Sequence, residues 1–385
     1  MERLKVCVYA ICRNEAKFVD RWMDSMREAD TVVVTDTLST DDTVERLRAR
    51  GAIVFTAEVK PWRFDVARNI SLGHVPEDAD ICVCTDLDEY FDPGWREKLE
   101  EAWRVSRSDA PGEVARLGKY LYNWSLKPDG SPDVQFYYDK VHSRHGFCWT
   151  CPVHEYVRYV GALPLVVVPI EGMVLNHAPD PLKSRGSYLP LLEMAVREAP
   201  GDERMRCYLG REYLFAGEWA KCVDTLMVYL SLPGATWREE RCAAMRWIAK
   251  AFWEMGQLDS AYAWSYRAVA EAPGMRDPYV DFAKVCYARG DWPMMYFLTE
   301  EALKIVEKSR TYVNSGDAWD FTPDDLCAVA AYHMKLHDTT AYHARHALSF
   351  APEDERLREN LRLAEEARKG VPIGLAQNNV MLHTQ

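Results

Sequence analysis

Three carboxylates in one short segment have the spacing of a cation-binding site. Asp86, Asp88 and Glu89 follow the apolar run 81–84, which is typical of a buried strand in a parallel sheet. Open α/β sheets bind ligands beyond the carboxyl ends of such strands. Asp86 and Asp88 are two positions apart, so an extended backbone would put both on one face. A divalent cation such as Mg²⁺ or Mn²⁺ would explain two adjacent like charges. A solvated acidic turn is the alternative interpretation.

The segments upstream would position these carboxylates. Short apolar runs at 5–11, 31–35 and 52–55 predict strands, and the stretches 16–26, 44–50 and 63–73 predict helices. Strands that alternate with helices form right-handed βαβ units and a parallel sheet. Four polar residues would then lie at strand ends on one edge of the sheet: Arg13, Glu15, Asp36 and Asp86. Four polar residues on one edge are more than the folding of the sheet requires, which indicates a functional site there.

Four motifs occur in a specific order along the first half of the chain. They are Arg13-Asn14-Glu15, the segment 36–43, the segment 64–69 and the segment 86–89. Together they resemble the family 2 glycosyltransferases of the GT-A fold, which use nucleotide-diphosphate sugars and a divalent metal. Leu38 and Asp42 depart from the family pattern, because glycine is frequent at both positions.

The resemblance implies roles for individual residues. The nucleotide would be bound by Arg13, Glu15, Asp36, Arg68 and Asp86. The metal, Mn²⁺ or Mg²⁺, would be held by Asp86, Asp88 and His177. Family members mostly invert the anomeric centre by direct displacement, which needs a general base near the acceptor. Glu155 is the expected base and His154 the alternative.

The middle of the chain, 113–177, is rich in residues that favour strands and resembles the acceptor half of the same fold. The turn at 127–132 predicts a hairpin-like connection within it. For His177, the structural alternative is a strand-end histidine that bonds to the backbone. For His154 and Glu155, it is a surface turn or an ion pair.

From about residue 182 the pattern becomes helical. Gly217, Gly256 and Gly290 recur between an aromatic-rich helix and a second helix. A degenerate fourth pair would cover 326–350, and a charged capping helix 353–369. This resembles tetratricopeptide-type helix pairs, which stack into a solenoid. The aromatic residues of these helices are expected to pack between helices rather than to bind sugar.

Composition limits the choice of partners and compartment. The 385 residues carry a formal charge of −12, which argues against a nucleic-acid backbone as partner. No apolar run is long enough to span a bilayer. The eleven scattered cysteines are typical of a reducing compartment, so a cytoplasmic location without a membrane span is expected. Cys148 and Cys151 have zinc-ligand spacing, but half-buried strand cysteines are the favoured interpretation.

The sequence therefore predicts an α/β GT-A domain at 1–180, an all-α tetratricopeptide-like solenoid at 181–370 and a tail at 371–385. The predicted activity is metal-dependent transfer of a sugar from a nucleotide-diphosphate sugar, with a UDP-sugar preferred. The acceptor stays open between a glycan, a peptide, a metabolite and a modified base. A protein partner or a second copy of the chain could bind the repeats. Two alternatives remain: a nucleotidyltransferase, and an interaction scaffold with a vestigial sugar-nucleotide domain.

Overall fold

The computed structural model describes residues 3–109, 115–180 and 188–369. The predicted tail at 371–385 lies outside these residues. The chain divides into two compact units: residues 1–199 with 310–312, and residues 200–309 with 313–385.

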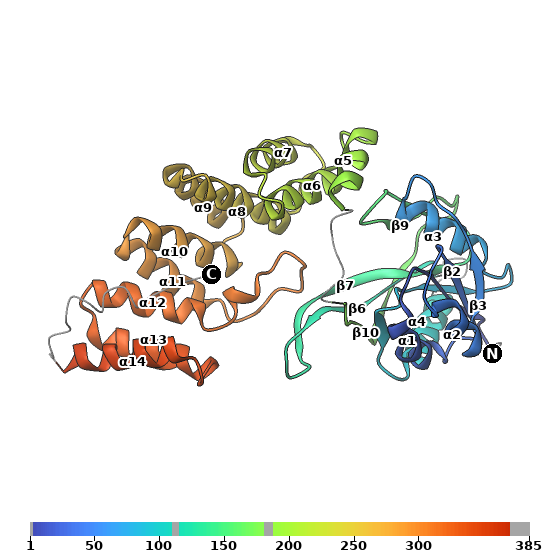
Figure 1. Ribbon diagram of the computed structural model, residues 1–385, viewed down its shortest axis with the longest axis horizontal. Helices are drawn as coiled ribbons and strands as arrows, with labels where there is room; N and C mark the ends of the chain where they lie inside the picture. Colours follow the sequence, from blue (N-terminus) through green and yellow to red (C-terminus); the bar gives the residue numbers. More distant parts are fainter. Residues whose placement is uncertain (1–2, 110–114, 181–187, 370–385) are drawn as a thin grey trace. The chain divides into compact units, whose positions relative to one another are not determined.

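The first unit is built on an eight-stranded mixed sheet with the strand order β3-β2-β1-β4-β7-β6-β10-β5 (Figure 1). Its strands are β1 (Val6–Cys12), β2 (Thr31–Asp36), β3 (Ile53–Thr56), β4 (Ile81–Cys84), β5 (Glu89–Phe91), β6 (Leu117–Leu126), β7 (Pro132–Ser143) and β10 (Val167–His177). A separate two-stranded ribbon is formed by β8 (Phe147–Thr150) and β9 (Tyr156–Tyr159). Its helices are η1 (Ala16–Phe18), α1 (Val19–Met26), α2 (Thr43–Ala49), α3 (Phe64–Gly73), α4 (Trp95–Asp109) and α5 (Tyr188–Glu198).

Strand β1 lies in the centre of the parallel part and is buried along its whole length. Its residues alternate between two hydrophobic clusters, as the two-residue period of a strand requires. Val8 packs in the cluster that includes Trp22 of α1 and Trp95 of α4. Tyr9 packs on the opposite face with Leu72 of α3 and Trp149 of β8. Both faces of the sheet are therefore covered, which explains why β1 and β4 are apolar runs without polar alternation.

The antiparallel part of the sheet contains the hairpin predicted around residues 127–132. β6 and β7 pair antiparallel, and the turn between them is closed by a backbone bond from Lys127 to Ser131 of 2.8 Å. β7 also pairs antiparallel with β4, with Val83 opposite Val141. β10 pairs with β5, which places His177 opposite Glu89. These long-range pairings bring the second half of the sheet to the acidic segment.

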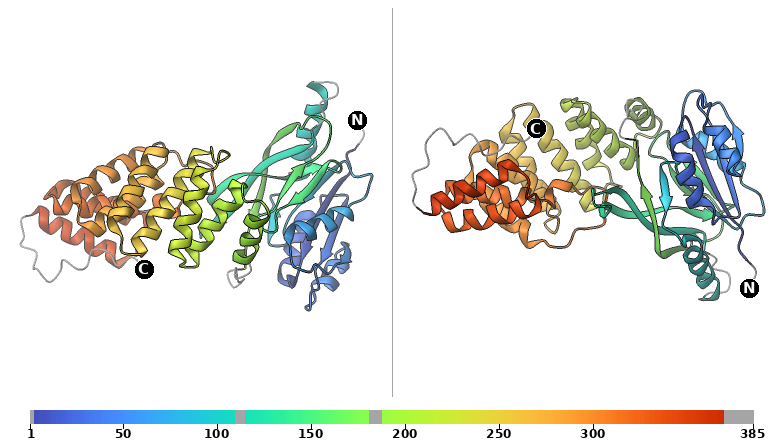
Figure 2. Two further views of the ribbon diagram at one scale, coloured as in Figure 1. Left: turned by 90° about the horizontal axis from the view of Figure 1, so that it is seen from above. Right: turned by 60° about the horizontal axis from the view of Figure 1, so that its bottom comes forward.

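The second unit is a succession of helix pairs packed side by side (Figure 2). Its helices are α6 (Glu203–Phe215), α7 (Trp219–Ser231), α8 (Arg238–Glu254), α9 (Leu258–Glu271), α10 (Asp277–Arg289), α11 (Trp292–Lys304), η2 (Gly316–Ala318), α12 (Thr322–His333), α13 (His337–Phe350) and α14 (Glu355–Arg368).

A residue in the left-handed conformation ends the first helix of each pair. Gly217, Gly256 and Gly290 have φ of 74°, 73° and 69°, a region that glycine enters at little cost. Lys335 takes the same conformation in the fourth pair, with φ of 62°. The recurring glycines of the sequence therefore mark the turns of the repeat, and the fourth pair is degenerate at this position.

The predicted fold class is confirmed: a GT-A-like mixed sheet is followed by an all-α, tetratricopeptide-like unit. Within the described residues, no helix is both long and apolar enough to cross a membrane.

Candidate functional site

The candidate site lies at the carboxyl ends of β1, β2 and β4. β1 pairs in parallel with β2 on one side and with β4 on the other. The chain order of the strands reverses direction at this point, which is where open α/β sheets bind their ligands. Cys12 ends β1 opposite Asp36 at the end of β2. The residues that follow these strands therefore share one edge of the sheet, as the sequence predicts.

Asp36 is buried and organises the loop that follows β2. Its carboxylate accepts backbone bonds from Leu38 at 3.1 Å and from Ser39 at 3.1 and 3.2 Å. Leu38 has a positive φ of 69°, so the loop uses the left-handed conformation that explains a frequent glycine there. Asp42 has φ of −79° and needs no glycine. With Leu38 and Asp42 in place of glycine, the loop therefore keeps its hydrogen bonds to the Asp36 carboxylate.

The loop after β1 is tied to the loop after β2. Asn14 adopts φ of 56°, its N–H donates to Ser39 Oγ at 2.8 Å, and its Oδ1 accepts from the Thr40 N–H at 2.7 Å. Glu15 is buried and its N–H donates to Thr43 Oγ1 at 2.9 Å. Arg13, between β1 and these residues, is exposed. Hydrogen bonds therefore join the first two motifs to each other.

Asp86 is held by two buried cations. Its Oδ1 lies 2.7 Å from Arg68 of α3, and its Oδ2 lies 3.2 Å from the Lys140 ammonium of β7. Arg68 is 3% exposed and Lys140 is 5% exposed. Burial opposes ionisation of Asp86, but Arg68 and Lys140 outweigh it and hold the pKa of Asp86 well below its ordinary value. Asp86 is therefore expected to be ionised at neutral pH.

The extended backbone predicted for the acidic segment is wrong. β4 ends at Cys84, and a turn closed by the Glu89 N–H on the Asp86 carbonyl at 3.1 Å follows it. The Glu89 carboxylate accepts in return from the Asp86 N–H at 2.8 Å. The turn sends Asp86 toward Arg68 and Lys140, whereas Asp88 contacts His177. The Asp86 and Asp88 carboxylates therefore have different partners instead of sharing one strand face.

Asp88 and His177 form the second polar pair. Nε2 of His177 lies 3.5 Å from Oδ2 of Asp88, which is 7% exposed. Nδ1 of His177 lies 3.1 Å from the Trp124 carbonyl; because a carbonyl only accepts, Nδ1 is the donor and Nε2 faces Asp88. Burial opposes protonation, but the contact with Asp88 outweighs it and raises the pKa of His177. One carboxylate and one oriented imidazole thus face each other.

Glu155 joins the site through Arg68. Its Oε1 lies 2.5 Å from Nε of Arg68, so this guanidinium bridges Glu155 and Asp86. The Arg68 guanidinium also lies 5.0 Å from the Trp149 ring centre. His154 has φ of 49°, and its ring lies 5.7 Å from that of Tyr188 in α5. Glu155 is therefore within the charged network, and it takes part in the kind of ion pair that the structural interpretation expected.

Sequence reasoning missed Lys140 and the buried position of Glu89. Lys140 is a single lysine in an aromatic-rich strand, and its ammonium lies 4.8 Å from the Tyr138 ring. Burial opposes its charge, but Asp86 and Glu89 outweigh it and raise the pKa of Lys140. The available signal was a lysine within the run 140–142, whose residues are all buried. The sequence did not indicate that Asp86 is the partner of Lys140, because only the pairing of β4 with β7 brings these two segments together.

Two of the three predicted metal ligands face each other at this edge, whereas among the described residues Asp86, Asp88 and His177 together do not form a group of three ligand atoms within 4.8 Å of one another. Asp88 and His177 offer an oxygen and a nitrogen that already face each other, a set that suits Mn²⁺ better than Mg²⁺. Both oxygens of Asp86 are already engaged by Arg68 and Lys140. Among the described residues, Cys148 and Cys151 belong to no group of three potential metal ligands.

Residues 7–151 match the family described as Glycosyl transferase family 2. Three solved structures show likeness. The first is the APC/C hetero-tetramer Cut9–Hcn1, with a TM-score of 0.39 and 12% sequence identity. The match covers 49% of this chain but only 34% of the matched chain. MamA has a TM-score of 0.35 at 14% identity, covering 49% of this chain and 87% of its own.

The third is a thermophilic TPR protein of Thermus thermophilus, with a TM-score of 0.33 at 18% identity, covering 46% of this chain and 88% of its own. The repeat character of the second unit is defined by its own helix pairs and left-handed turns.

Proposed function

Since the chain carries a family 2 glycosyltransferase domain at residues 7–151, followed by a tetratricopeptide-like unit, we propose that it transfers a sugar from a nucleotide-diphosphate sugar to an acceptor. The observation that carries the proposal is the charged network at the end of β4, where Asp86, Arg68 and Glu155 are linked beside the pair of Asp88 and His177. A buried network of this kind at a sheet switch point is typical of a functional site.

The first two loops would bind the nucleotide. Asp36 and Glu15 would accept hydrogen bonds from N–H and O–H groups of the base and ribose. A carboxylate has about four lone-pair sites, so Asp36 can accept from a ligand while it holds its own loop. Arg13 is exposed beside them and would approach the same nucleotide. A UDP-sugar is the first donor to test.

Asp88 and His177 would hold the metal, with Mn²⁺ preferred, and Asp86 would support them through its charge. When bound, the metal would act as a Lewis acid on the diphosphate leaving group. Arg68, held by Glu155 and Asp86, would add a fixed positive charge for the same oxygens. These groups are preorganised by burial and by each other, so little reorganisation would be needed.

We assign the general base to Glu155, with His154 as the alternative. The acceptor nucleophile would attack the anomeric carbon as the bond to the diphosphate breaks. The electron pair of that bond would leave with the diphosphate, and the base would take the acceptor proton. Direct displacement would invert the anomeric centre. The bond between Glu155 and Arg68 supports a second role, in which Glu155 fixes Arg68, and the two roles have different kinetic signatures.

The repeat unit would bind the acceptor or a protein partner. Stacked helix pairs present an extended surface for such binding. The residues of the charged network all belong to the first unit, so the repeats are dispensable for binding the donor in this proposal.

Hydrolysis and binding of nucleotide sugars test the function directly. A thermal-shift screen of UDP-, GDP- and TDP-sugars with and without Mn²⁺ should give a higher melting temperature for one nucleotide class, with a larger shift when Mn²⁺ is present, because a ligand stabilises the state that binds it. Release of the nucleotide diphosphate would then measure turnover. Binding without turnover would favour the vestigial-domain alternative. Release of pyrophosphate from a nucleoside triphosphate would favour a nucleotidyltransferase.

A further inference from the structure

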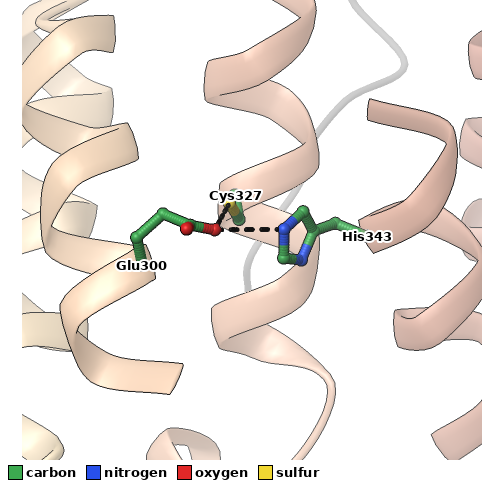
Figure 3. Close-up of side chains that lie close together, drawn as sticks. All are labelled: Glu300, Cys327 and His343. Carbon is green, nitrogen blue, oxygen red and sulfur yellow. Dashed lines mark hydrogen bonds and ion pairs between the residues drawn. The ribbon is translucent and has the colours of Figure 1, made fainter. Parts of the chain in front are cut away.

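A second group of potential metal ligands lies in the repeat unit. Glu300 of α11, Cys327 of α12 and His343 of α13 point toward one another from three successive helices (Figure 3). One ligand atom of each residue lies within 4.8 Å of the other two. Within the described parts of the chain, this is the one group of three His, Cys, Asp or Glu residues that meets this distance.

The histidine of this group is oriented by a buried carboxylate. Nδ1 of His343 lies 2.8 Å from Oδ1 of Asp324, and Asp324 is 1% exposed. Because an ionised carboxylate only accepts, Nδ1 donates to Asp324 and Nε2 faces Glu300, 3.2 Å away. Both of these facing atoms can bind a cation, and a metal ion would take the place of the proton between them. A carboxylate behind a metal-binding imidazole is a common arrangement, since it fixes the tautomer and the ring orientation. His346 bonds to the other oxygen of Asp324 at 2.8 Å.

The separations between ligand atoms are close to those of a tetrahedral zinc site. Bonds of about 2.3 Å to sulfur and about 2.0–2.2 Å to nitrogen and oxygen put tetrahedral ligands about 3.3–3.6 Å apart. Oε1 of Glu300 lies 3.2 Å from Nε2 of His343 and 3.6 Å from Sγ of Cys327. The distance from the Cys327 sulfur to the His343 imidazole is at most 4.8 Å, and a rotation of one side chain brings it into the range of a tetrahedral site.

We propose that Glu300, Cys327 and His343 bind Zn²⁺. Thiolate, imidazole and carboxylate are the ligand types that this ion prefers. On binding, the ion replaces the proton of the Cys327 thiol, and that proton passes to solvent. Cys327 is fully buried and His343 is 5% exposed, whereas the Glu300 side chain is 38% exposed. The ion therefore enters from the Glu300 side, and water completes its coordination there.

The site would tie the third helix pair to the fourth. α11 belongs to the third pair, while α12 and α13 form the fourth, which lacks the glycine of the other turns. Stability in a repeat protein comes largely from interfaces between neighbouring repeats. Binding to the folded state alone would raise the melting temperature of this part of the chain.

Cobalt provides a direct probe of the thiolate. Metal-stripped full-length protein is titrated with Co²⁺, and near-ultraviolet absorption is followed for the thiolate-to-cobalt charge-transfer band. Zn²⁺ is then added as competitor. We expect the band to appear with about one Co²⁺ per chain and to disappear when Zn²⁺ is added. The Asp88→Ala background keeps the proposed sugar-nucleotide site from competing for the ion.

Cysteine variants show which thiolate gives rise to the charge-transfer band. Cys327→Ser should abolish it, whereas Cys286→Ser, which changes another fully buried cysteine of the unit, and Cys148→Ser should retain it. Glu300→Gln changes a partly exposed side chain and leaves the helices folded; it should weaken Zn²⁺ binding at least about 10-fold, and Asp324→Asn should weaken it about 10–100-fold. A wild-type protein without the band overturns the proposal, as does a band that survives Cys327→Ser or Zn²⁺ affinity unchanged in Glu300→Gln.

Discussion

The ammonium of Lys140 lies 3.2 Å from Oδ2 of Asp86. Arg68 occupies the other oxygen of the same carboxylate at 2.7 Å. Two cations already balance the charge of this carboxylate, which disfavours a third cation beside it, so Asp86 mainly holds Arg68 and Lys140 in place. Asp88, which faces His177, is then the first candidate for contact with a metal. These different roles of Asp86 and Asp88 lead to the first two predictions.

Lys140→Met should destabilise the first unit. The substitution keeps most of the side-chain volume but leaves Asp86 and the buried Glu89 without their shared cation. Removal of one partner from a fully buried pair costs about 3–5 kcal/mol; because Asp86 is partly exposed, we expect a decrease of about 2–3 kcal/mol in the free energy of unfolding, measured by urea denaturation. Lys119→Met, on the exposed side of β6, is the matched control. Equal stability of the two variants would contradict the assignment.

Asp88→Ala should abolish sugar transfer and metal-dependent nucleotide binding while the fold is retained. The substitution removes the carboxylate that faces His177, and with it the charge that would attract the metal. Calorimetric titration of Mn²⁺ in the presence of a nucleotide diphosphate measures the loss, and circular dichroism checks the fold. Asp78→Ala removes an exposed carboxylate that precedes β4 and should behave like the wild type. Turnover close to normal in Asp88→Ala would remove Asp88 from the site.

Glu155→Gln should lower the rate of transfer by about 10²-fold if Glu155 is the base. The amide keeps the shape of the side chain but cannot take the acceptor proton. In that case kcat falls, and the affinity for the nucleotide sugar changes little. If Glu155 instead fixes Arg68, the affinity for the diphosphate falls as well. His154→Ala tests the alternative base, and Glu171→Gln, on an exposed position of β10, serves as control.

Stability at low pH should depend on His142. This imidazole is fully buried, and it lies 2.8 Å from the Tyr9 hydroxyl through Nε2 and 2.8 Å from the Ser143 carbonyl through Nδ1. Nδ1 therefore donates, and the neutral ring satisfies both contacts. Burial lowers the pKa of His142 from its ordinary 6.5 to about 4. As the pH falls, the unfolded chain binds a proton at His142 before the folded chain does. The contribution of the neutral imidazole to the free energy of unfolding is therefore complete above about pH 6.5 and is lost as the pH falls toward 4.

The comparison of wild type with His142→Gln isolates this effect from the carboxylates that titrate in the same range. The wild type should lose about 3 kcal/mol relative to the variant between pH 6.5 and pH 4, from about 1.4 kcal/mol for each unit of pKa. Urea denaturation at several pH values measures the difference. Parallel pH profiles for the two proteins would show that His142 does not titrate between the two states.

Local patterns in the sequence were sufficient for the order of elements and for the first part of the site. The apolar run before Asp86, the polar residues after β1 and β2, and the recurring glycines of the repeats each report on neighbouring residues, because burial, strand ends and tight turns depend on local composition and spacing. The same locality explains why the shared face expected for Asp86 and Asp88 does not occur. A two-residue spacing predicts a shared face only while the backbone stays extended, and the bonds between Asp86 and Glu89 close a turn there.

The tertiary structure alone decided which distant residues complete each group. Lys140 reaches Asp86 because β7 pairs antiparallel with β4, and His177 reaches Asp88 because β10 pairs with β5. Glu300, Cys327 and His343 meet because three helices pack side by side. Such contacts arise from strand order and helix stacking, which depend on the burial of the whole core rather than on the residues near each partner in the sequence.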